Sequence, residues 1–205
     1  MNEANKIIDR RNQFRDALTG ALALGQNTRL TASQQAAVAR AANAYGTEGD
    51  GNKVIVGFGA QPTGTGAFTD GTPMDDEIFV TFKANHHGNE LINDVVHEGS
   101  HVADNQNFNA THLGGVYDYD GPSDISHYET ERRAYEVSSF AAQAVGAASY
   151  PNNVEPRNQI WNGAWKAADR ATKRAAGIDR LIYTHYNLSK ASPGWTFGQI
   201  KKNMP

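Results

Sequence analysis

Two histidines and a glutamate lie close together near the middle of the chain, in the segment Asn93-Asp-Val-Val-His97-Glu98-Gly-Ser-His101. On a helix, His97 and His101 are about 40° apart around the axis, so both imidazoles can reach one metal ion. Glu98 points to the same open side, where its carboxylate can hold a water molecule. The spacing therefore predicts a Zn²⁺ site in which the metal lowers the pKa of water toward ~7 and Glu98 accepts the proton.

The residues around this segment have the pattern of a helix with one apolar face. Counted at about 100° per residue from His97, the apolar residues lie between about 140° and 260°. These are Ile92, Val95, Val96, Gly99, Val102 and Ala103. The histidines and acidic residues lie on the opposite face, as a helix beside a metal-binding cleft requires. A solvated polar face that contains the spacing by chance is the alternative.

A third ligand is needed, because a catalytic zinc ion generally takes three protein donors and keeps one position open. His97, Glu98 and His101 form an HExxH motif. Asp104 and Asn107 occupy the positions at which a glycine and a third histidine would extend this motif. The predicted helix 126–147 offers glutamates, and Glu131 shares its small apolar face with residues such as Ala134. An unpaired carboxylate on a buried face costs several kcal/mol, and a zinc ion removes that cost. The pattern favours Glu131 as the third ligand.

Other carboxylates have alternative roles. Glu129 and Glu136 lie on the opposite face of the helix, and Glu129 also fits a capping box with Ser126. Glu131 itself could instead form a buried salt bridge. An aspartate-ligand site would use Asp118 or Asp120 from the segment GGVYDYDG.

Two more aspartates flank the histidines. Asp94 and Asp104 each lie about one turn from a histidine, where they could accept a hydrogen bond from an imidazole N–H. Solvated helix charges are the alternative for both.

The arrangement of His97, Glu98, His101 and Glu131 resembles that of the zincin metallopeptidases of the glutamate-ligand type, the gluzincins. The segment ETERRAYEV after the HExxH motif is also similar to that of compact bacterial effector and toxin metalloproteases. The resemblance covers about residues 77–145, and no NExxSD-like continuation of the thermolysin group follows. It implies a hydrolase, a zinc endopeptidase that cleaves protein or peptide substrates. It also implies an immunity or inhibitor protein as a candidate partner.

The resemblance carries two further expectations. Zincins have an edge strand before the metal-site helix that pairs with an extended substrate, and Glu77–Ala84 is placed for this role. An ordinary internal strand is the alternative. Metallopeptidases also use a tyrosine or histidine to stabilise the oxyanion, and Tyr135 and His185 are the catalytic candidates, followed by Tyr117 and Tyr119. His185 also fits a hydrogen-bonded core histidine.

Helical patterns dominate the rest of the chain. Amphipathic stripes and capping signals predict helices at 3–24, 31–45, 89–106, 126–147, 156–176 and 178–188. Thr31 and Gln34 form a capping box at the start of the second helix, and Gly177 is expected to end the fifth.

Two strand-like runs, 53–58 and 77–84, flank a segment that fits a loop or a hairpin connection. We expect an α+β fold, mostly helical and zincin-like, with a small β-sheet packed beside the HExxH helix. A single domain would span 1–205, with N-terminal helices (1–46), the sheet and metal-site helices (47–147), and C-terminal helices (148–205).

Composition excludes several classes of protein. With 39% apolar and 20% charged residues, the chain is neither collagen-like nor wholly disordered. The absence of cysteine excludes disulfides and thiolate metal sites. No apolar run approaches the ~20 residues of a membrane span, and the N-terminus MNEANKIIDRRNQF is too polar for a signal peptide. We expect a soluble protein that, if exported, uses a dedicated secretion system.

Charge is distributed unevenly along the chain, although the net charge is only −3. Residues 1–45 carry +3, residues 46–156 carry −13 and residues 157–205 carry +7. Because the domain as a whole is not basic, we expect no nucleic-acid partner. The acidic centre and basic ends fit one alternative function, a non-enzymatic helical interaction module whose metal site is structural or absent.

Overall fold

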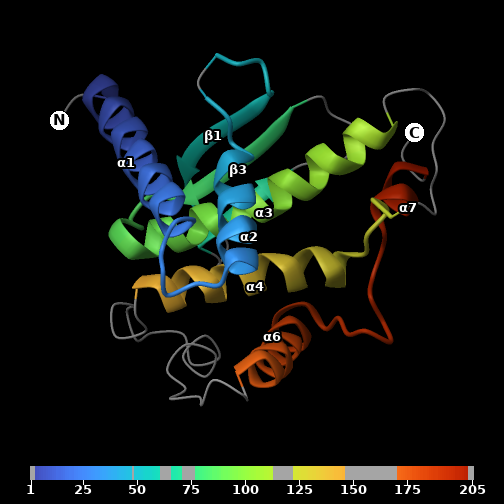
Figure 1. The fold of residues 1–205 in the computed structure, drawn as a ribbon. Helices are drawn as coiled ribbons and strands as arrows, with labels where there is room; N and C mark the ends of the chain where they lie inside the picture. The colour runs from blue at the N-terminus through green and yellow to red at the C-terminus, as the bar shows by residue number, and fades with distance from the viewer. Residues whose placement is uncertain are drawn as a thin grey trace.

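The computed structural model describes residues 3–47, 49–60, 66–70, 77–112, 122–145 and 170–202. In these ranges the chain forms an α+β fold with a small mixed sheet, as the sequence predicts (Figure 1). The helices are α1 (Glu3–Leu24), α2 (Ala32–Asn43), α3 (Gly88–His112), α4 (His127–Val145), α6 (Arg170–Tyr186) and α7 (Phe197–Lys202). The strands are β1 (Val54–Gly59), β2 (Ala67–Asp70) and β3 (Ile78–Lys83).

The sheet has the strand order β1-β3-β2, with β1 parallel and β2 antiparallel to β3. Because β3 is paired on both sides, the expectation that Glu77–Ala84 is an edge strand is wrong, and the internal-strand alternative is confirmed. Strand β2 is the edge strand on the side of β3 away from β1. It lies in the segment expected to be a loop or a hairpin connection. The alternation in β3 is as predicted: Ile78, Val80 and Phe82 are buried and Phe79 is exposed.

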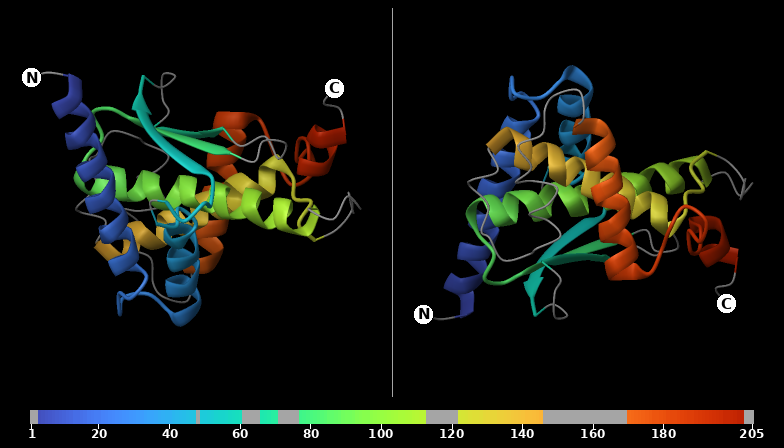
Figure 2. Two further views of the ribbon diagram at one scale, coloured as in Figure 1. Left: turned by 90° about the horizontal axis from the view of Figure 1, so that it is seen from above. Right: turned by 90° about the horizontal axis from the view of Figure 1, so that it is seen from below.

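The helix α3, which contains His97, Glu98 and His101, runs through the centre of the molecule, between the sheet and α4 (Figure 2). It contacts α1, α2, α4, β2 and β3. Its predicted apolar back is confirmed, because Val95, Val96 and Val102 are fully buried in the main core. Burial of side chains of this size stabilises the fold by roughly 1.5–3 kcal/mol each, and it holds the opposite face of α3 in one orientation.

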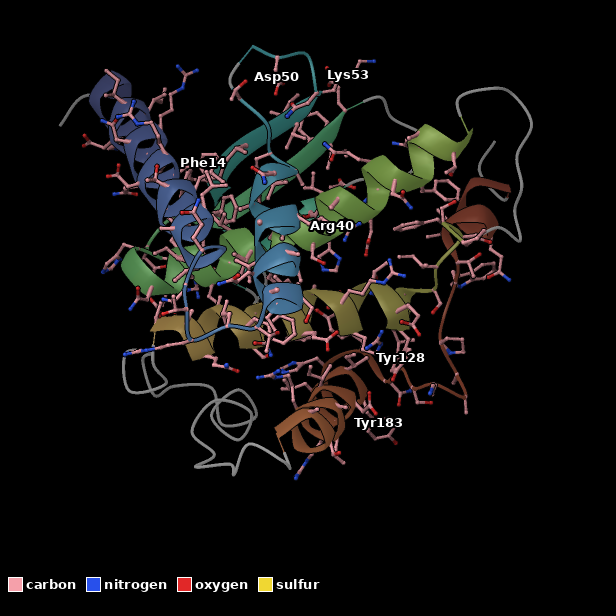
Figure 3. The ribbon with its side chains drawn as sticks, viewed as in Figure 1. Phe14, Arg40, Asp50, Lys53, Tyr128 and Tyr183 are labelled. Atoms are coloured by element: carbon pink, nitrogen blue, oxygen red, sulfur yellow. The ribbon has the colours of Figure 1, made fainter. Side chains whose placement is uncertain are left out.

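Close contacts hold the N-terminal helices against α3 and the sheet. Gly99 is buried, and a Cβ there would collide with the carbonyl of Ala41 in α2, so a glycine permits this close approach. The hydroxyl of Tyr45 donates to the carbonyl of Val95 at 2.9 Å. Phe14 of α1 points toward the sheet, and its ring centroid lies 5.7 Å from that of Phe82 (Figure 3).

The helix α3 extends to His112, beyond the predicted end at residue 106. Phe108, which is fully buried, packs on Phe197 with the ring centroids 5.4 Å apart. This contact with the C-terminal part of the chain favours the additional helical turns.

A second apolar cluster joins α6 to α4. It contains Tyr128, Tyr135, Ile178, Leu181 and Ile182. Gly177 lies inside α6, so the prediction that it ends a helix is wrong. A glycine costs about 1 kcal/mol in a helix interior, and burial of the three aliphatic residues that follow outweighs this cost. The remainder of the predicted helix 156–176, before residue 170, lies outside the described residues.

The segment after α6, residues 187–196, returns to the beginning of α4, and we call it the C-terminal strap. The backbone N–H groups of His127 and Tyr128 donate to the carbonyls of Trp195 (3.0 Å) and Pro193 (2.9 Å). The Ser126 hydroxyl accepts from the N–H of Glu129, which confirms Ser126 as the capping residue. The first turn of α4 is thus held in place by side-chain and tertiary acceptors.

No helix within the described ranges is both long and apolar enough to cross a membrane.

Candidate metal centre

The packing of α4 against α3 brings three predicted ligands together. His97, His101 and Glu131 each offer one donor atom, and these atoms lie within 4.8 Å of one another. Glu131 Oε2 is 3.7 Å from His97 Nε2, and Glu131 Oε1 is 3.6 Å from His101 Nε2. Two imidazoles one helical turn apart therefore face a carboxylate from the neighbouring helix.

The environment of Glu131 fits a bound cation. The residue is only 6% exposed, and its Oε2 atom is buried without a hydrogen-bond partner in the described part of the chain. Burial by itself would raise the pKa of Glu131. Attraction to His101 and interactions with His127 and His97 outweigh burial and lower the pKa below its ordinary value. The carboxylate is therefore ionised at neutral pH, as a metal ligand must be.

Other residues of α4 orient the imidazole of His97. Its Nδ1 atom lies 3.2 Å from Ser138 Oγ, and the ring of Tyr135 packs edge-on against it with centroids 4.8 Å apart. A hydrogen bond at one imidazole nitrogen fixes the ring so that the other nitrogen can bind metal. Tyr135 and Ser138 follow Glu131 by four and seven residues, so all three share one stripe of α4. That spacing is visible in the sequence, although it did not by itself identify Ser138 as the partner of His97.

The two aspartates near the histidines have other partners. Asp104 accepts from Arg40 at 2.8 Å and from Arg133 at 3.1 Å. Asp94 Oδ2 lies 2.5 Å from His86 Nδ1. Both carboxylates are buried, so the alternative that they are solvated helix charges is wrong. Neither makes the predicted contact with a ligand histidine.

The remaining glutamates of α4 face away from the cluster. Glu129 and Glu136 are ion-paired with Arg132 at 3.0 Å and 3.6 Å. The predicted division of the helix into two faces is therefore confirmed. The alternative ligands Asp118 and Asp120, and the candidate donors Tyr117 and Tyr119, lie outside the described residues.

Glu98 is buried next to His97, with 5% of its surface exposed. The hydroxyl of Thr69, on strand β2, donates to Glu98 Oε2 at 2.6 Å. One carboxylate oxygen thus has a fixed partner, and the sequence contained no signal for this contact because the two residues are far apart in the chain.

The two predicted oxyanion donors have different surroundings. Tyr135 is buried against His97, whereas His185 is exposed near the end of α6, with its ring centroid 6.4 Å from that of Tyr186. The neighbouring Tyr186 is the residue of α6 that interacts with Glu131 and Tyr135. Burial, followed by the negative charge of Glu131, raises the pKa of Tyr186 far above its ordinary value. Its phenol therefore stays protonated and can donate.

One further histidine lies at the edge of the cluster. His127 Nε2 is 3.6 Å from Glu131 Oε1, and its side chain is 47% exposed. Its ring lies 5.3 Å from that of Tyr186, centroid to centroid. The i, i+4 spacing of His127 and Glu131 on α4 is the sequence signal that could have identified this pair.

Comparison of the chain with protein-family models, with curated proteins and with solved structures finds no match.

Proposed function

We propose that the protein is a zinc-dependent metallopeptidase that hydrolyses peptide bonds in protein or peptide substrates. The observation that supports this most strongly is the cluster of the half-buried His97 and His101 with the buried Glu131, in which one carboxylate oxygen has no hydrogen-bond partner among the described residues. Two imidazoles and one carboxylate form a donor set that suits Zn²⁺, and three protein ligands leave a position open for chemistry.

The residues of the site divide into binding and proton-transfer roles. His97, His101 and Glu131 would hold the ion, which when bound lowers the pKa of water and polarises a carbonyl. Glu98 accepts the proton of the attacking water and delivers it to the leaving amine. Ser138 keeps the imidazole of His97 oriented.

The sheet offers a place for an extended substrate. The resemblance implied that Glu77–Ala84 pairs with an extended substrate. Because β3 is internal, we assign this substrate-pairing role to the edge strand β2. This strand contacts α3, and its Thr69 touches Glu98. We propose that a substrate peptide pairs with the edge of β2 that no described strand occupies, and so lies alongside α3.

Tyr186 is our choice for the group that stabilises the oxyanion. We expect Tyr186→Phe to lower kcat about 100-fold with zinc content unchanged, because it removes one donor from the developing charge. Initial rates on an unstructured protein substrate, with zinc measured on the same samples, test this. Tyr183→Phe is the matched control, since Tyr183 lies on the same helix and is 61% exposed. An undiminished kcat in Tyr186→Phe, together with a loss in Tyr135→Phe, would assign the role to Tyr135.

Metal analysis tests the proposal as a whole. We expect the purified protein to contain about one zinc ion per chain, as a three-ligand site predicts, and to hydrolyse denatured casein. A chelator should abolish hydrolysis, and added Zn²⁺ should restore it. A protein with neither zinc nor hydrolysis would instead favour the helical interaction module.

A further inference from the structure

Strand β2 makes a short hydrogen bond to Glu98, the base of the proposed reaction, and neither residue of this contact is exposed. The Thr69 hydroxyl donates to Glu98 Oε2 at 2.6 Å. Glu98 is buried, and Thr69 is half-buried on an edge strand. A hydrogen bond to a carboxylate in such surroundings is stronger than a neutral one.

A second contact holds the same strand against the same face of α3. At Gly66, directly before β2, a Cβ would lie 2.8 Å from Asp94 Oδ1 and 3.0 Å from His86 Cε1. The backbone therefore passes close to the Asp94–His86 pair. Asp94 and Glu98 are four residues apart on α3 and therefore lie on one face of the helix. The contacts of Gly66 with Asp94 and of Thr69 with Glu98 thus fix the position of β2 along the axis of α3.

We infer, on the basis of the proposed function, that Thr69 is a positioning residue for Glu98. Its hydroxyl holds one carboxylate oxygen of Glu98, and the proposed mechanism assigns the proton transfer to the other oxygen. A glutamate side chain has several rotatable bonds, and a misplacement of about 1 Å at a reacting group can lower the rate 10²-fold. Strand β2, which we propose for substrate binding, thereby also orients the carboxylate of Glu98.

Kinetics of two substitutions test this role. We expect Thr69→Val, which keeps the shape but removes the hydroxyl, to lower kcat between about 10-fold and 100-fold with KM and zinc content unchanged. Thr69→Ser keeps the hydroxyl and should retain most of the kcat. Thr19→Val is the control, because it also removes a threonine hydrogen bond, to the carbonyl of Arg15, on an exposed part of α1.

A measurement without catalysis tests the contact itself. In a double-mutant cycle of Thr69→Val and Glu98→Ala, the effect of Thr69→Val on the urea unfolding midpoint should shrink when Glu98 is absent. Additive effects, or an unchanged kcat in Thr69→Val alongside an active wild type, would overturn this inference alone. A wild type without hydrolysis would overturn the proposed function, and the role of Thr69 in catalysis with it.

Discussion

The Glu98→Gln protein is expected to lose peptide hydrolysis while it keeps its zinc. Glutamine has almost the same shape as glutamate, and its amide oxygen can still accept from Thr69, but it cannot take up the proton of the attacking water. Loss of a general base typically lowers the rate 10²- to 10⁴-fold, so we expect kcat to fall by at least about 100-fold. Initial rates on denatured casein and zinc content of the same samples check this.

Glu90→Gln is the matched control for this substitution. Glu90 lies in the first turn of the same helix, and it is not among the residues that meet at the cluster. Its replacement should leave both zinc content and rate unchanged. Full activity of Glu98→Gln would end the proposed mechanism.

The second large effect is expected at the third ligand. We expect Glu131→Ala to weaken zinc binding by more than about 100-fold, since loss even of a residue that only supports a ligand weakens it 10- to 100-fold. The substitution leaves His97 and His101 facing each other without the carboxylate between them. Competition with a chromophoric chelator measures the affinity.

The control is Glu136→Ala on the same helix. Glu136 is half-buried and paired only loosely with Arg132, at 3.6 Å, so zinc affinity should not change. Because Glu131 is buried, Glu131→Gln, which preserves volume, separates loss of metal from loss of folding. If Glu136→Ala weakened zinc binding more than Glu131→Ala, the ligand assignment would be wrong.

Local sequence predicted much of α3. The 3.6-residue period placed Val95, Val96 and Val102 on one face and the histidines on the other, and their burial confirms this division. The same reasoning separated Glu131 from Glu129 and Glu136 on α4. These features follow from backbone geometry within one element, so the sequence of that element contains the information.

The paired strands show where local patterns end. Alternation predicted the buried face of β3 correctly, but not its position between β1 and β2. Strand order depends on which segments meet after the chain has closed its loops. No period-two pattern records that choice, and β2, with four residues, was too short to give a clear signal.

The sequence alone determined that His97, Glu98 and His101 would lie on one side of a helix, because residues three and four apart in a helix are neighbours on its surface. Only the tertiary structure decided which groups meet that face. The crossing of α6 on α4 brings Tyr186 to Glu131 and leaves His185 exposed, although both follow the same apolar stripe. The contact of Thr69 with Glu98, and that of Ser138 with His97, likewise join separate elements. Such contacts arise from packing between elements, whose free energy depends on the whole core.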